Sequence, residues 1–382
     1  MTSWRRPSLL VAVVAVLVTG CSGAASSAPG AASAAPSAAP PESAAPASAE
    51  PSAPPTADIC TNPPKAEGQT LTFASYGGAY QDAQRKGWLE PYTALTGVKF
   101  QESEDSSNAT IKAQVEAGQV TWDLVDVGND FGLDANAALL EPLDYTKIHK
   151  DEILPGFAST YRVADITYGV VLGYNTDKTA GKVPAGWADF FDLAKFPGKR
   201  GFWDYSAGGI FEFALLADGV APKDLYPLDL PRATAKLDTI KDSIVFWGSG
   251  AESQDLLGKG EVAMSMIWNG RAYSAKHIDN RPVEIQWNQQ IVTADYLVVP
   301  KGTPNKDLAM DFIAWSTCKE NNAAPSKYIP YGPTNTLATA DPSKVAELSV
   351  SNADENSAYF DDAWIVDNAQ TLEDAYQAWK TK

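Results

Sequence analysis

Aromatic and acidic residues recur in short stretches that follow or open the expected strands. Tyr and Trp rings attract a cation to their faces, and a nearby carboxylate adds a direct charge partner. The candidate binding residues are Tyr76, Gly77, Gly78, Tyr80, Asp126, Asp130, Trp203, Asp204, Trp247, Ser249, Trp268, Asn269, Arg271, Asp295 and Tyr296. Together they suit a small molecule that carries an ammonium group. Each stretch alone also fits a packed core, where Trp and Tyr are more often found.

The stretch from 75 to 84, SYGGAYQDAQ, predicts a strand end, a turn at two glycines, and a helix start. Glycines let a ligand approach the backbone, and the first N–H groups of a helix are unpaired donors. The same letters also describe a plain strand-to-helix turn.

Arg271 points to a different solute class. A buried guanidinium repels a polycation but holds a carboxylate well, often through two parallel hydrogen bonds. Arg271 therefore favours an amino-carboxylate, unless it pairs with a neighbouring Asp and is purely structural. The sequence leaves both interpretations open.

Residues that support enzyme chemistry are scarce. The two histidines, His149 and His277, do not stand in metal-ligand spacing, and neither a Gly-x-Ser-x-Gly elbow nor a Walker loop occurs in the sequence. The acidic residues between 354 and 362 lack the spacing of an EF-hand loop. We therefore expect no enzyme activity, no cofactor and no metal. An exported hydrolase and a structural lipoprotein remain remote alternatives.

The N-terminus indicates export. Arg5 and Arg6 precede an uncharged apolar run over 9–18, which ends in small residues before Cys21. This pattern resembles a bacterial lipoprotein signal over 1–21 with a lipidated Cys21; an ordinary secretory signal is the alternative. Residues 22–57 are almost wholly Ala, Ser and Pro, which predicts a disordered linker. We expect the protein on the outer face of the cytoplasmic membrane, anchored only by lipid.

Charge and cysteine content agree with export. The formal net charge is −17, which argues against a nucleic-acid partner, since such proteins carry a basic face. Apart from Cys21, the only cysteines are Cys60 and Cys318. In an oxidising compartment these two are predicted to form a disulfide; two buried free thiols are the alternative.

The hydrophobic pattern alternates between strands and helices. Strands are predicted near 70–75, 98–100, 123–127, 168–175 and 297–299, the last opened by Asp295. Helices are predicted near 79–95, 109–117, 209–218, 231–241, 308–316 and 371–380. This alternation predicts an α/β fold with parallel sheets.

Taken as a set, several segments resemble the solute-binding proteins of ABC importers, in the spermidine/putrescine-type branch. They are SYGGAYQDAQRKGWLEPYTALTGVKF, YGVVLGYNTDK, FFDLAKFPGKRG, ALLADGVAPKDLYPLD, GKGEVAMSMIWNGRAY, DYLVVPKGTPNKDLAMDFIAW and YIPYGPTN, in order over about 70–335. The resemblance implies a two-lobed, type II periplasmic-binding-protein fold with strands crossing between the lobes. It implies lobe 1 at 58–172 and 296–340, lobe 2 at 173–295, and a C-terminal segment, 341–382, that packs on both.

The resemblance also implies a function and partners. We expect a monomeric receptor that captures an amine-bearing solute of polyamine type between its lobes and delivers it to a membrane permease. An amino-carboxylate, such as a γ-aminobutyrate-like or opine-like solute, is the alternative, because the wider family includes such receptors and Arg271 suits them.

Overall fold

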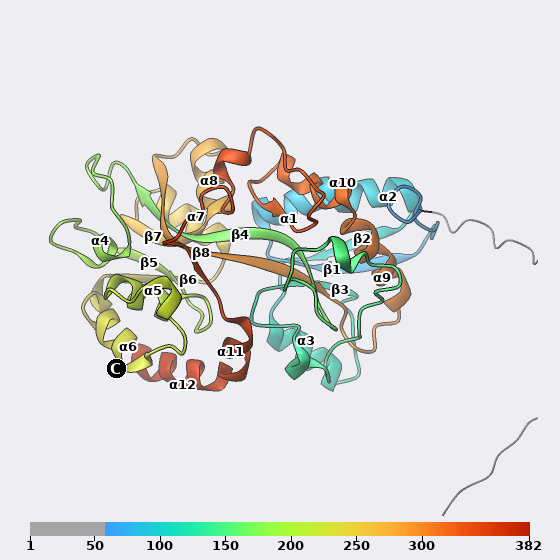
Figure 1. Ribbon diagram of the computed structural model, residues 1–382, viewed down its shortest axis with the longest axis horizontal. Helices are drawn as coiled ribbons and strands as arrows, with labels where there is room; N and C mark the ends of the chain where they lie inside the picture. The colour runs from blue at the N-terminus through green and yellow to red at the C-terminus, as the bar shows by residue number, and fades with distance from the viewer. Residues whose placement is uncertain (1–57) are drawn as a thin grey trace, which may run out of the picture. The chain divides into compact units, whose positions relative to one another are not determined.

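The computed structural model describes residues 58–382 (Figure 1). The predicted signal at 1–21, the lipidation of Cys21 and the linker at 22–57 lie outside the described residues. Within the described part, no helix combines the length and apolar character that a membrane span requires.

One mixed sheet runs through the described residues, in the order β2-β1-β3-β8-β4-β7-β5-β6, with two short strands added at β4 and β8. The strands are β1 Thr70–Ala74, β2 Lys99–Ser103, β3 Leu124–Val127, β4 Val163–Asn175, β5 Arg200–Trp203, β6 Ile244–Trp247, β7 Met264–Trp268, β8 Val283–Val298, β9 Gly332–Pro333 and β10 Ala358–Tyr359. Parallel pairs join β1 to β2 and β3, and β5 to β6 and β7. The prediction of parallel strands is therefore correct only for the strands toward the two edges of the sheet.

The centre of the sheet is antiparallel, because two long strands run through both halves of the fold. β4 and β8 pair over most of their lengths, and β4 is buried throughout. In Figure 1 they connect the part around β1, β2 and β3 with the part around β5, β6 and β7. We call these parts the β1 lobe and the β5 lobe. Asp295 does not open a strand, as the sequence predicted, but lies near the end of the 16-residue β8.

Helices cover both lobes. They are α1 Gly78–Gln84, α2 Glu90–Thr96, α3 Asn108–Glu116, α4 Trp187–Phe191, α5 Ile210–Ala217, α6 Leu230–Asp238, α7 Gly250–Gly258, α8 Asn269–His277, α9 Lys306–Ser316, α10 Lys319–Asn322, α11 Asp362–Asp367 and α12 Ala369–Lys380. Local capping explains several starts: the side chains of Ser107, Asp229 and Ser249 each accept a backbone N–H in the first turn of α3, α6 and α7. The single helix predicted over 79–95 is divided by a π-helical turn, Arg85–Leu89.

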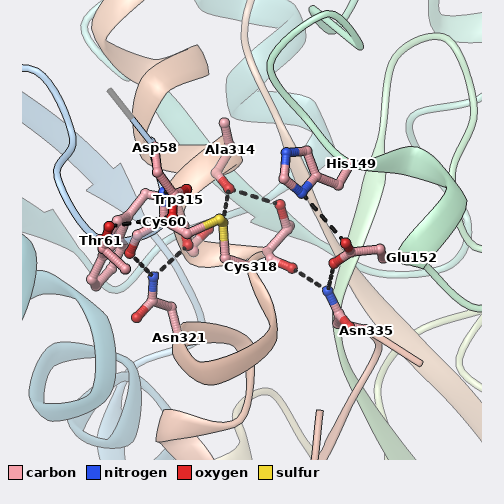
Figure 2. Close-up of a disulfide and its surroundings, with 12 residues drawn as sticks. Asp58, Cys60, Thr61, His149, Glu152, Ala314, Trp315, Cys318, Asn321 and Asn335 are labelled. Atoms are coloured by element: carbon pink, nitrogen blue, oxygen red, sulfur yellow. Dashed lines mark hydrogen bonds and ion pairs between the residues drawn. A yellow bond between two sulfur atoms is a disulfide. The ribbon is translucent and has the colours of Figure 1, made fainter. Parts of the chain in front are cut away.

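A disulfide between Cys60 and Cys318 ties the start of the described chain to the end of α9, with Cα atoms 5.6 Å apart (Figure 2). Cys318 is buried, and the side chain of Asn321 donates a hydrogen bond to the carbonyl of Cys60 at 3.1 Å. The bridge spans 258 positions of the sequence, so it connects segments that no local structure would hold together.

Candidate functional site

A cavity lies between the two lobes, at the ends of the strands. Its lining comes from the loop after β1 and the start of α1, from the loop after β3, from the end of β5 and the loop that follows it, from the end of β7, from β4 and β8, and from the segment before β9. The lining residues are Tyr76, Tyr80, Gly128, Asn129, Asp130, Tyr168, Trp203, Tyr205, Ala207, Trp268, Asp295 and Tyr331. Six of the predicted site residues are in this set: Tyr76, Tyr80, Asp130, Trp203, Trp268 and Asp295. The free volume enclosed is about 20 Å³, on a measure where one water molecule needs about 10–15 Å³.

Aromatic rings form most of the cavity wall, with Trp268 at their centre. The ring centroid of Trp268 lies 5.2 Å from that of Trp203, 6.0 Å from Tyr76 and 6.4 Å from Tyr168, each in an edge-to-face arrangement. These rings come from both lobes. The wall therefore offers ring faces and edges to a ligand while excluding water from it.

Three carboxylates lie beneath this wall, on three neighbouring strands. Asp126 is on β3, Asp295 on β8 and Asp165 at a bulge in β4. All three are buried, and Asp295 alone lines the cavity. Burial, and then the charge of Asp126, raise the pKa of Asp295 and of Asp165 well above the ordinary value. Burial also raises the pKa of Asp126, although hydrogen bonds from Tyr80 and other side chains act against it.

No positive charge within residues 58–382 pairs with these acids. Among the ion pairs formed by residues 58–382, none includes Asp126, Asp165 or Asp295. Over the same residues, no group of three or more His, Cys, Asp or Glu side chains could hold a metal ion. The cluster is thus suited to a cation that arrives with a ligand.

Asp130 joins the two lobes. It follows β3 in the β1 lobe, and its carboxylate accepts hydrogen bonds from the hydroxyl of Tyr205, in the β5 lobe, and from the side chain of Asn108, at 3.0 Å. Burial raises the pKa of Asp130, and the hydrogen bond from Tyr205 acts against that rise. Asp130 already has two donors, whereas Asp295 faces the cavity without a charged partner.

Arg271 does not line the cavity, contrary to the sequence prediction. It is 1% exposed, and its Nη2 donates to the carbonyl oxygens of Gly77 at 2.8 Å and Tyr76 at 3.3 Å. A Cβ built on Gly78 would lie 2.6 Å from its Nη1, so the glycine makes room for the guanidinium. Gly77 and Gly78 therefore serve this contact between α8 and the loop before α1, and do not line the cavity.

Other predicted residues also lie outside the cavity. On β8 successive side chains point to opposite faces, so Asp295 faces the cavity while Tyr296 faces away. Asp204 lies in the bend after β5, between Trp203 and Tyr205, which both line the cavity. Tyr296 instead lines a separate groove beside Asp362, to which its hydroxyl donates at 3.2 Å. Asp204 contacts α12.

The remaining predicted residues lie behind the cavity wall or in a groove next to the cavity. Trp247 is 1% exposed and stacks behind Trp203, with ring centroids 5.9 Å apart. Asn269 donates to the carbonyl of Pro330 at 2.8 Å and accepts from the backbone of Gly169 at 2.9 Å, so it holds main chain in place. Ser249 lines a groove that adjoins the cavity and shares its aromatic wall.

Sequence reasoning missed six lining residues: Gly128, Asn129, Tyr168, Tyr205, Ala207 and Tyr331. Signals for three were present. Tyr168 begins the apolar run of a crossing strand, Tyr205 closes the aromatic stretch GFWDY that contains Trp203, and Tyr331 lies in the segment YIPYGPTN.

Known proteins with similar sequences share this architecture. The profile of the family "bacterial extracellular solute-binding protein" matches residues 87–350. The γ-aminobutyric acid-binding protein of Pseudomonas aeruginosa is 35% identical over 329 residues, which cover 83% of this chain and 93% of the relative. The spermidine/putrescine-binding periplasmic protein of Escherichia coli K12 is 25% identical over 240 residues, covering 59% of this chain and 68% of the relative.

Solved structures agree. The Atu4243 GABA receptor superposes with a TM-score of 0.73 and 41% identity, covering 82% of this chain and 98% of that one. The binding protein AgtB from Agrobacterium tumefaciens R10, solved with agropinic acid, has a TM-score of 0.77 and 32% identity. The match covers 83% of this chain and 100% of AgtB. The fold is thus the two-lobed, type II periplasmic-binding-protein fold, with β4 and β8 as the crossing strands. The chain belongs to the bacterial extracellular solute-binding proteins, the solute receptors of ABC importers, and is not an enzyme.

Proposed function

We propose that this receptor binds a small amino-carboxylate of the γ-aminobutyrate type, with its ammonium group at Asp295. The observation that carries the proposal is a buried carboxylate that faces an aromatic cavity without a cationic partner among the described residues. An ammonium group at Asp295 would supply the missing charge, and the rings around it would strengthen the pairing by removing water.

The geometry favours one ammonium group over several. A polyamine carries several cations, whereas the acids in the cavity lining are Asp130 and Asp295, and Asp130 is engaged by Tyr205 and Asn108. The relatives that match over most of the chain support the same choice, since one is a γ-aminobutyric acid-binding protein and one was solved with agropinic acid. Polyamine binding, the first expectation from sequence, is therefore the second candidate.

Export, lipid anchoring through Cys21 and delivery to a membrane permease complete the proposal. They are supported by the signal pattern at the N-terminus and by membership of the family. We propose a monomer, because the solute cavity is complete within one chain.

Three matched solutes test the solute class: γ-aminobutyrate, n-butylamine and putrescine share an amine and a short chain but differ at the far end. Calorimetry on the parent should give the tightest binding for γ-aminobutyrate. Asp295→Asn should weaken this binding by about 1.5–3 kcal/mol, the contribution of a charged hydrogen bond. Tightest binding of putrescine would instead support the polyamine candidate. Binding that is unchanged in Asp295→Asn would place the ammonium group elsewhere.

A further inference from the structure

The two helices at the C-terminus, α11 and α12, contact both loops that form the cavity wall. One loop, residues 129–131 after β3, carries Asp130 in the β1 lobe. The other, residues 203–207 at the end of β5 and just beyond it, carries Trp203 and Tyr205 in the β5 lobe. Figure 1 shows α12 beside α6 of the β5 lobe. α11 comes just before α12, where the chain arrives from the crossing strands. Neither helix supplies a residue to the cavity lining.

α11 holds the first loop through an intermediary arginine. Arg162, which precedes β4, is 3% exposed and donates through Nη1 to the carbonyls of Asn129 at 2.7 Å and Phe131 at 2.8 Å. Its Nη2 donates to Asp362 of α11 at 2.6 Å. The two carbonyls flank Asp130, so the position of its carboxylate depends on where Arg162 is held.

α12 holds the second loop through the residues that face away from the cavity. Asp204 accepts from the hydroxyl of Tyr376 at 2.7 Å and from Lys380, and Ser206 donates to Glu373 at 2.7 Å. These two positions alternate with Trp203, Tyr205 and Ala207, which line the cavity. Trp203, Tyr205 and Ala207 thus each have a sequence neighbour that is bonded to α12.

We propose that α11 and α12 form a brace that sets the relative position of the two wall loops, with Asp362 and Glu373 as positioning residues for solute binding. The proposal rests on the solute function proposed above. The hydrogen bond between Tyr205 and Asp130 closes the wall, and it forms only when both loops are correctly placed. Binding sites lose affinity when the residues behind them shift by fractions of an ångström, so the brace determines how tightly the solute is held.

The first test removes the charge at Asp362. Asp362→Asn should lower the affinity for γ-aminobutyrate roughly tenfold, the lower end of what outer supporting residues contribute at metal sites. Asp367→Asn, the same change at an exposed position of α11, should leave affinity unchanged. In an Asp130→Asn background, Asp362→Asn should change affinity by less than about twofold, because residues that act through one another are not additive. Equal effects in both backgrounds would overturn the proposal.

A second measurement needs no solute. In protein labelled with fluorotryptophan, the fluorine resonance of Trp203, assigned through Trp203→Phe, reports the position of the wall. Ser206→Ala and Asp362→Asn should each shift this resonance, and Asp367→Asn should not. An unshifted resonance in both variants would overturn the brace. A parent that binds none of the three matched solutes would instead overturn the proposed function and leave this test valid.

Discussion

Replacing Arg271 by Gln separates two roles for the buried guanidinium. In the structure, Arg271 belongs to α8 of the β5 lobe and donates to the carbonyls of Tyr76 and Gly77 in the β1 lobe. Its other nitrogens, Nε and Nη1, have no hydrogen-bond partner among the described residues. The residue therefore acts as a contact between the lobes, which stabilises their closed arrangement whatever solute lies in the cavity.

The size of the effect follows from these contacts. A hydrogen bond from a charged donor contributes about 1.5–3 kcal/mol, and the longer of the two bonds, at 3.3 Å, counts at the low end or below it. Against this gain, Arg271 is a buried charge, and burial lowers its pKa. Gln removes the cost of burying that charge and keeps an N–H donor on a shorter side chain. We expect a net loss of about 2 kcal/mol in solute binding, or roughly 30-fold in Kd.

The assay compares solutes as well as variants. Calorimetry with γ-aminobutyrate and n-butylamine should show the same fold loss for both in Arg271→Gln, since the lost contact does not involve the solute. Lys276→Gln removes a charge from the same helix at a partly exposed ion pair with Glu284 and should change neither affinity. A loss confined to γ-aminobutyrate would refute this reasoning and assign Arg271 to the solute carboxylate.

Three further predictions concern buried groups. Burial raises the pKa of Glu212 from 4.5 to about 7, so between these pH values the native state retains a proton that the unfolded state has lost. The free energy of unfolding should therefore fall by up to about 3 kcal/mol as pH rises from 4.5 to 7. In urea unfolding, Glu212→Gln should lack this pH dependence, and an identical pH dependence in the variant would contradict the assignment. Solute affinity should rise with pH above the range where an ordinary Asp carboxyl titrates, and it should rise less in Asp295→Asn, because the raised pKa means that Asp295 must lose a proton before it pairs with an ammonium group; calorimetry over a pH series measures this. Changing both Cys60 and Cys318 to Ser should lower the free energy of unfolding by about 2–5 kcal/mol, and urea unfolding of the oxidised parent that matches the variant would contradict a stabilising bridge.

The elements of the fold could largely be predicted from sequence, but their pairing could not. Periodicity located β1, β3 and most of β4, and it placed α5, α9 and α12 within a few residues. It gave no sign that β4 would pair antiparallel with β8 across both lobes, because a fully buried strand reads as a continuous apolar run whichever partner it has. The π-helical turn in the first long helix was missed for a similar reason, since its residues keep a helical pattern.

Part of the site could be predicted from sequence, since six of the predicted residues line the cavity and the others do not. Which of two adjacent residues faces the cavity depends on the local path of the backbone, which a single sequence does not reveal. Tyr205 faces the cavity in place of Asp204, and Asp295 does so without Tyr296. Asp165 was missed entirely, because it lies at a bulge in β4, within a run that reads as core.

The buried acids link solute binding to the stability of the closed form. The charge of Asp126 raises the cost of ionising both Asp165 and Asp295, so without a cation the cluster either holds protons or destabilises the fold. An ammonium group at Asp295 relieves this repulsion only when the aromatic wall has closed around it, since the rings come from both lobes. The favourable charge pairing is thus available in the closed state and not in the open one. A ligand shifts an equilibrium only by its difference in affinity for the two states. The acid cluster contributes to that difference, so a solute with an ammonium group should favour the closed lobes more than a neutral molecule of the same shape does.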